Sequence, residues 1–388
     1  MLYYRYRPIS ELTLKELRYN ELYFSSRAEN NDPYDGKIFL SYDFDIEKWE
    51  RFVYAAIAKS SFDEKFIKEL SKKLAVKFHS DRIMTYQDIA NYNFMQSIQL
   101  VEPSLGKIFA YNLTEIIKQF IDIYRPHDKY SVSFSKANNE ILLWSHYASK
   151  HKGFCLIFKA IDGYLYQDKK QKRTSISRKT PKGIISPRIS TGIADKFQFN
   201  DITYCSECTM IDASKYMPSY VYGKCSKEEE SRISQERYLK SFEKHDCWKY
   251  EEESRLILDT PLPWISGEHF EYSQDERLFY YQPTQLVGII YGALMDDDTK
   301  IRLNKIVQTV RDKMWENIKD DIVFDFIVFQ AKISNQSRTL DIIPEEIHTA
   351  TQIIKNTEDK FNTLYDNWLK GEGIKFNEKG GAKRVVIS

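Results

Sequence analysis

Short stretches of alternating polar and apolar residues recur along the chain, and they predict strands. Period-two alternation places successive side chains on opposite faces of a half-buried strand, and a short apolar run is typical of a strand buried on both faces. The predicted strands are Leu2–Arg7, Glu21–Ser26, Lys129–Lys136, Phe154–Phe158, Leu286–Tyr291 and Ile322–Gln330. Because regular helices do not separate consecutive strands, we expect an α+β domain built on a mostly antiparallel, twisted sheet.

Apolar residues at spacings of three and four mark a block of helices from Asp45 to about Arg125. We interpret this block as a helical insertion packed on one side of the sheet. The expected division is 1–44, N-terminal strands of the core; 45–128, helical insertion; 129–295, remainder of the core; and 296–388, a C-terminal α/β extension and tail. Within the extension we expect a helix at Pro344–Leu369 and a loosely held tail at Gly371–Ser388.

Composition singles out no partner. Lys plus Arg (57) nearly cancel Asp plus Glu (56), so no overall field attracts a nucleic acid or a membrane. No apolar run approaches the length of about 18 residues that spans a bilayer. The five cysteines, an odd number, form no disulfide framework, and the lone C-x-x-C of Cys205 and Cys208 lacks a second close pair, so we assign no metal. We expect a cytoplasmic protein that needs no membrane.

The segment Asn138–Phe158 gathers Trp144, His146, Tyr147 and a second histidine, His151, between two predicted strands. The two histidines are five residues apart, which on a helix separates them by about 140°, whereas a helical metal pair needs a spacing of four. A zinc site is therefore not expected. Two alternatives remain: a turn that packs its aromatic rings into the core, or the wall of a pocket.

Charged residues form rows on two predicted strands. Arg5 and Arg7 share one face of the first strand, and burying them requires carboxylate partners, solvent or an anionic ligand. If the extended conformation begins by Glu251, then Glu251, Glu253 and Arg255 also share a face. That row is either a charge-stabilising site or a structural ladder of ion pairs.

A basic stretch lies at Asp168–Arg188, with eight basic residues against one acid. Its glycine and prolines break any helix, so the simplest interpretation is an exposed, solvated loop. The alternative is a contact surface for phosphate or nucleic acid, although the interleaved aromatic residues of a stacking surface are missing.

Four stretches together resemble one known family. They are Y-R-Y-R followed by L-Y-F-S-S at the N-terminus, N-D-P-Y-D at Asn31–Asp35, W-S-H-Y-A with H-x-G-F-C-L-x-F, and W-x-x-E-x-E-x-R at Trp248–Arg255. The set is similar to a widespread bacterial and phage-associated family catalogued as a domain of unknown function. This resemblance implies a role in bacterial stress or antiphage defence, possible partners being a protein of the defence system and a protein or nucleic-acid acceptor, with oligomers left open.

The order of the candidate residues also resembles the ADP-ribosyltransferase fold. Enzymes of that kind begin with a strand carrying Arg or His, continue through a helix and a strand with Ser or Tyr, and carry the catalytic Glu on a late strand. The resemblance implies NAD as the cofactor or co-substrate. It assigns Arg5 or Arg7 to phosphate, Ser25 to ribose, Tyr147 or Trp144 to stacking on the nicotinamide, and Glu253, assisted by Glu251, to catalysis. His146 is also expected among the cofactor-binding residues.

Two alternatives from other classes stay open. The first is a non-catalytic interaction or scaffold protein, whose charged rows are structural. The second is a metal-dependent nuclease that holds magnesium with Asp32, Asp35, Glu251 and Glu253. Spatial clustering separates the three. Arg5, Trp144 and Glu253 around one pocket favour the transferase, and four carboxylates within about 5 Å favour the nuclease. No phosphate loop, G-x-S-x-G or H-E-x-x-H motif points elsewhere.

Overall fold

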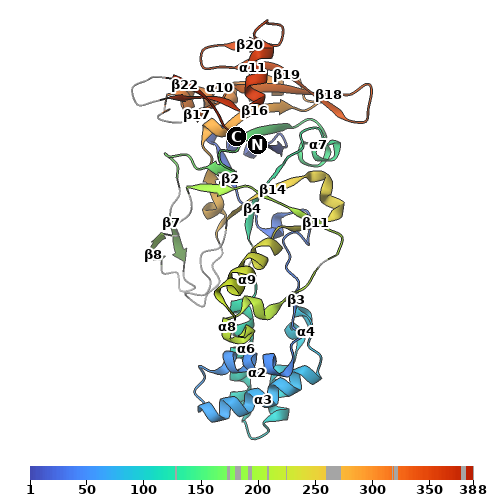
Figure 1. The fold of residues 1–388 in the computed structure, drawn as a ribbon, viewed down its shortest axis with the longest axis vertical. Coiled ribbons are helices and arrows are strands. Elements are labelled where there is room, and N and C mark those ends of the chain that lie inside the picture. Colours follow the sequence, from blue (N-terminus) through green and yellow to red (C-terminus); the bar gives the residue numbers. More distant parts are fainter. Residues whose placement is uncertain are drawn as a thin grey trace.

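The computed structural model describes residues 1–126, 129–172, 195–207, 209–223, 225–258, 272–316, 318, 322–376 and 382–387, together with the backbone of 175–179 and 185–190. Its central feature is a nine-stranded sheet (Figure 1). In spatial order the strands are β10 (Asn200–Asp201), β14 (Glu253–Leu258), β4 (Tyr130–Ser135), β1 (Leu2–Arg7), β5 (Phe154–Lys159), β16 (Leu286–Tyr291), β18 (Phe326–Ile333), β19 (Leu340–His348) and β20 (Ile353–Lys355).

Neighbouring strands of this sheet are antiparallel except for β16 and β18, which are parallel. The parallel pair is joined through helix α10 (Asp297–Trp315), as a crossover between parallel strands requires. The expected α+β class and mostly antiparallel sheet are therefore confirmed.

Apolar clusters cover both faces of the sheet. Strand β5 shows the alternation: Phe154, Leu156 and Phe158 enter one cluster, whereas Cys155 and Ile157 enter the other. Helices α1 (Glu11–Tyr19) and α10 pack on the first face, and α7 (Ile141–Tyr147) and α11 (Phe361–Leu369) pack on the second. A strand between two such layers is apolar throughout, which explains the continuous run of β5.

The helical region lies at the far end of the long axis from the sheet (Figure 1), not packed on one side of the sheet as expected. It has its own apolar cluster, to which residues 211–221 also contribute. Residues 86–101 form two helices rather than one, because Asn93 caps a new helix. The helices of this region are α2 (Ile46–Ile57), α3 (Glu64–Ser80), α4 (Tyr86–Asn91), α5 (Phe94–Val101), α6 (Lys107–Tyr124) and α8 (Ser219–Tyr222). Helix α9 (Lys227–Lys240) lies between this region and the sheet (Figure 1).

The remaining strands form small sheets. They are β2 (Glu21–Tyr23) with β15 (Leu278–Tyr280), β3 (Leu40–Ser41) with β12 (Ile211–Asp212), β6 (Tyr164–Tyr166) with β9 (Lys196–Gln198), β7 (Ser175–Lys179) with β8 (Ile185–Ser190), β11 (Thr203–Cys205) with β13 (Glu243–His245), and β17 (Ile322–Val323) with β21 (Glu372–Phe376) and β22 (Ala382–Val386). The basic stretch thus includes the antiparallel pair β7–β8, and its residues 173–174 and 180–184 lie outside the described residues.

The C-terminal prediction was wrong in detail. The predicted helix from Pro344 begins only at Phe361, because Pro344 lies inside strand β19, opposite Phe329 at a register shift. A bulge tolerates proline in a strand, since no ladder hydrogen bond from its nitrogen is needed there. The predicted tail contains strands β21 and β22.

An unusual turn joins α7 to β5. Ser149, Lys150 and His151 have φ angles of 49°, 54° and 66°, three consecutive left-handed residues. Gly153 follows, and a Cβ added there would lie 2.3 Å from the carbonyl oxygen of Arg7. The turn is therefore pressed against the end of β1, and only glycine fits at this position.

Candidate functional site

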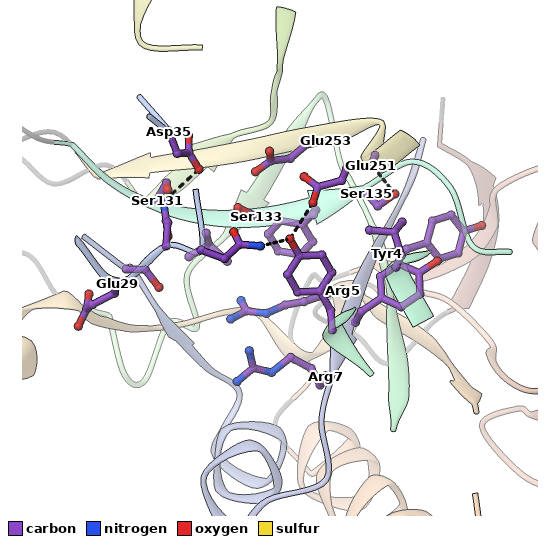
Figure 2. Close-up of a pocket in the computed structure, with 18 of the residues that line it drawn as sticks. Tyr4, Arg5, Arg7, Glu29, Asp35, Ser131, Ser133, Ser135, Glu251 and Glu253 are labelled. Atoms are coloured by element: carbon purple, nitrogen blue, oxygen red, sulfur yellow. Dashed lines mark hydrogen bonds between the residues drawn. The ribbon is translucent and has the colours of Figure 1, made fainter. Parts of the chain in front are cut away.

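A cavity of about 360 Å³ opens where β1 and β4 separate (Figure 2). Strand β1 pairs with β5 from Leu2 to Arg7, but it meets β4 at one pair only, Tyr4 with Ser135. Further along β4, the neighbour of Ser131 is Ser25 rather than a residue of β1, and the two serines form two backbone hydrogen bonds of 2.9 Å. Ser133, between these two contacts, lines the opening.

Arginines form one wall of the cavity. Arg7 is paired with Glu16. Arg5 is only 8% exposed, its Nη1 has no hydrogen-bond partner, and no carboxylate among the described residues forms an ion pair with it. Its guanidinium carbon lies 5.7 Å from the centre of the Phe134 ring. Burial, helped by the neighbouring charge of Arg7, lowers the pKa of Arg5 to about 10. Arg5 is thus a buried cation without a partner, which is costly unless an anion binds it.

Carboxylates form the opposite wall, and Glu253 is its centre. Arg255 donates to both oxygens of Glu253, at 2.6 and 2.8 Å, and Lys244 Nζ lies 3.0 Å away. Arg255 also donates to both oxygens of Asp35, at 2.5 and 2.7 Å. Burial alone would raise the pKa of Glu253, but Arg255 and Lys244 outweigh it and hold this pKa at about 2. Glu253 is therefore ionised at any physiological pH.

Glu251 lies beside Glu253 but not on the same strand. It ends a 3₁₀ turn at Asp246–Glu251, Glu252 is left-handed with φ 41°, and β14 begins at Glu253. The expectation that the extended conformation starts by Glu251 was wrong. The two carboxylates still meet, because Lys244 donates to both. The Tyr147 hydroxyl donates to Glu251 at 2.7 Å, and burial and the charge of Glu251 raise the pKa of Tyr147.

The two walls carry opposite net charge. On the acidic wall, three carboxylates (Asp35, Glu251, Glu253) face two cations (Lys244, Arg255), which leaves one net negative charge. On the other wall, Arg5 and Arg7 face Glu16 alone, which leaves one net positive charge. A ligand in this cavity would lie between the two walls.

Six of the residues expected at the site line this cavity: Arg5, Arg7, Ser25, Tyr147, Glu251 and Glu253. The other two expected residues, Trp144 and His146, do not line the cavity. Trp144 is fully buried in the core, where it meets the Tyr6 ring edge-on at 5.1 Å and donates its indole N–H to Asn138 O at 2.9 Å. It therefore has no free face for a ligand ring. His146 is exposed and lies outside the lining.

Several lining residues were missed from the sequence. Ser131, Ser133 and Ser135 lie on one face of β4 and line the cavity. The alternation of Lys129–Lys136 indicated a shared face for them, but not what that face would meet. Lys244 gave no signal, because it lies on a strand of only three residues, too short to show a periodic pattern.

The carboxylates of the nuclease alternative are not grouped around a vacant point. Asp35 and Glu253 are both held by Arg255, and Asp32 lines a different cavity. Within the described ranges, no group of three or more His, Cys, Asp or Glu residues could hold a metal ion. Cys205 lies at the end of β11, and Cys208 falls outside the described residues.

Fold and site together define the class: an α+β protein with a large, mostly antiparallel sheet and a charged cavity between two of its strands. Residues 143–256 match the family model described as "Protein of unknown function (DUF2971)". The predicted resemblance to a family of unknown function is thus confirmed over a segment that carries Tyr147, Lys244, Glu251 and Glu253 but not β1. Comparisons with curated proteins and with solved structures find no match. None of the helices described here is both long and apolar enough to cross a membrane.

Proposed function

We propose that this protein is an NAD-using, ADP-ribosyltransferase-like enzyme acting in bacterial stress or antiphage defence. One observation carries the proposal: a buried, unpaired guanidinium, Arg5, faces a wall of net negative charge across one small cavity. An anion that binds Arg5 would leave its other end beside Glu251 and Glu253. NAD combines an anionic pyrophosphate with a nicotinamide ring that is already cationic, so its two ends match the two walls.

Each wall suits one part of that ligand. Arginine binds phosphate oxygens through two parallel N–H groups, a task open to Arg5. The hydroxyls of Ser25 and Ser133 are suited to the riboses, and the Tyr147 ring to the nicotinamide. A volume of about 360 Å³ is at the small end for a ligand pocket, so we assign it to the nicotinamide half, with the adenosine extending outward.

The chemistry follows from the charge of the acidic wall. In ADP-ribosyl transfer the bond from ribose C1′ to the nicotinamide nitrogen breaks, and its electron pair neutralises the ring. Positive charge then develops on the ribose until an acceptor oxygen or nitrogen bonds to C1′ and loses its proton. A fixed negative charge beside the ribose stabilises this state. Because Glu253 is held by two cations, its position is fixed before the ligand arrives.

Strand order supports the likeness to the ADP-ribosyltransferase layout. The arginine strand β1, the serine-bearing β4 and the glutamate strand β14 are consecutive in the sheet. The strand expected to carry the serine, β2, instead pairs with β15, and only Ser25 beyond its end reaches β4.

Release of nicotinamide from labelled NAD tests the proposal. Glu251→Gln and Glu253→Gln should each lower the rate by about a hundredfold or more, because each removes charge where the transition state needs it. Glu252→Gln is the matched control, since this neighbouring carboxylate is exposed and outside the cavity. Full activity in a folded Glu251→Gln protein would contradict the proposal. NAD labelled in the adenosine, added to a lysate, would then identify the acceptor.

Arg5→Met separates binding from folding. Replacing a buried unpaired cation with an apolar side chain of similar length should leave the free energy of unfolding unchanged or raise it by about 1 kcal/mol or more. Excess NAD should raise the melting temperature of the wild type but not of this variant, since ligand stabilises only a protein that binds it. An equal rise in both proteins would remove Arg5 from the site.

A further inference from the structure

A second cavity, of about 280 Å³, lies next to the first. Its walls come from the loop before β3, from β11 and β13, and from the 3₁₀ turn that follows β13. Lys244 is the one residue that lines both cavities. Its ammonium group holds Glu251 and Glu253 on the first side and lies 5.0 Å from the centre of the Trp248 ring on the second.

Three aromatic rings contribute to the walls of this second cavity. The rings of Tyr34 and Phe39 are 22° from parallel with centres 6.5 Å apart, and Trp248 contributes a third ring. Ring faces favour a flat ligand that stacks on them over an aliphatic one of the same volume. Ile38 adds apolar surface beside them. A cavity of this size accepts a two-ring compound.

One cation at this cavity has no acidic partner. Of the lysines that line it, Lys240 pairs with Glu243, and Lys244 is held by the two glutamates of the first cavity. Asp32, the acid of the loop that lines this cavity, accepts the backbone N–H of Tyr34. Lys37 remains: its Nζ lies 5.2 Å from the ring centres of both Tyr34 and Phe39, and no carboxylate of the described chain pairs with it.

We propose that the second cavity binds a flat aromatic or heteroaromatic compound that carries an anionic group. The ring stacks against Trp248, Phe39 and Tyr34, and the anion pairs with Lys37 at the mouth. This site needs no assumption about the reaction in the first cavity.

Thiol protection tests the proposal with 2-naphthoate as the probe. Cys247 lines the cavity and is exposed, whereas Cys225 lies outside it, so alkylation by iodoacetamide can be followed at both thiols in one sample. At twice its Kd, 2-naphthoate should slow alkylation of Cys247 about threefold and leave Cys225 unchanged. Decahydro-2-naphthoate, which has the same skeleton but is not flat, should protect much less.

Variants of the lining residues test which side chain binds the ring of the ligand and which binds its anionic group. Trp248→Ala should abolish protection and Trp248→Phe should retain it, because phenylalanine keeps a flat ring. Lys37→Met should weaken the binding of 2-naphthoate about two- to fivefold, as expected for loss of an exposed ion pair. The binding of uncharged 2-naphthol should be unaffected. Arg5→Met should change nothing here, which keeps this test apart from that of NAD binding. Equal protection of both thiols, equal effects of the flat and saturated acids, or undiminished protection in Trp248→Ala would overturn the proposal.

Discussion

Two buried cations converge on the Glu253 carboxylate, and this makes the residue structural whether or not it is catalytic. Arg255 and Lys244 each depend on it, and Arg255 connects it to Asp35 in the loop that borders the cavity. Removing one member of such a group leaves the others buried and underpaired. The alternatives of catalytic site and ion-pair ladder are therefore compatible, since one set of contacts fixes the charge and stabilises the fold.

Glu253→Gln should accordingly lower the free energy of unfolding at pH 7 by about 3 kcal/mol or more. The folded pKa of about 2 lies below the unfolded value of 4.5, so the contribution is present above pH 4.5 and is lost as the pH falls through 2. Urea unfolding between pH 7 and pH 2.5 measures this. The wild type should lose more stability than Glu253→Gln over that range, with Glu252→Gln following the wild type. Parallel curves for all three proteins would show that Glu253 is not held as described.

At the scale of elements, the turn between α7 and β5 gives the H-x-G motif of His151 and Gly153 a structural role. His151 O and Gly153 O both lie against Gly292, and a Cβ on Gly292 would be 2.2 and 2.6 Å from them. Gly153 is pressed against the Arg7 carbonyl in the same way. Three backbone segments therefore meet without side chains between them, and this contact fixes the end of β1 from which Arg7 projects.

Gly153→Ala should destabilise the protein by about 3 kcal/mol or more, because the added methyl group meets backbone atoms that cannot move aside. Gly163→Ala is the comparison: unlike Gly153 this glycine has a positive φ, of 79°, but it has open space around it, so only the backbone cost of about 1 kcal/mol applies. Chemical denaturation of the two variants gives the comparison. Equal losses of stability in the two variants would show that the backbone contact at Gly153 leaves room for a methyl group.

Local patterns predicted the elements whose burial is regular. The sequence predicted strands β1, β5 and β16, because their apolar residues either alternate or run continuously, according to whether one face or both faces enter an apolar layer. The helix predicted from Pro344 was wrong, because a bulge that forms only on pairing with β18 makes this proline acceptable in strand β19. The cavity depends on the order β14–β4–β1 and on their separation after Tyr4. Pairing between distant segments leaves no periodic signal, so Lys244 and the role of Ser133 could not be predicted.

At the scale of the whole molecule, the sheet and the helical region have separate apolar cores. The site draws its residues from the sheet and the neighbouring loops, and no side chain of helices α2–α6 lines the first cavity. The helical region is thus positioned to change in stability without changing the site.

Leu74→Ala tests this separation. Leu74 is fully buried in α3, so its truncation should destabilise the helical region by about 3 kcal/mol. Amide hydrogen exchange should quicken in α3 but not in β5, and the proposed release of nicotinamide from NAD should stay at the wild-type rate. Leu156→Ala, on strand β5 opposite Arg5 of β1, is the counterpart expected to affect β5 and the site. Faster exchange in β5 of Leu74→Ala would show that the two cores unfold together.

The separation of β1 and β4 has a consequence for synthesis of the protein. Strand β1 leaves the ribosome before the other strands of the sheet, yet its neighbours β4 and β5 follow only after the helical region, and β14 follows later still. Until residue 255 has emerged, Arg5 has no opposite wall, so no partial chain lacking β14 can have a complete cavity. Contacts between such distant segments form slowly. The complete cavity therefore forms only after β14 has been synthesised, however early β1 is available.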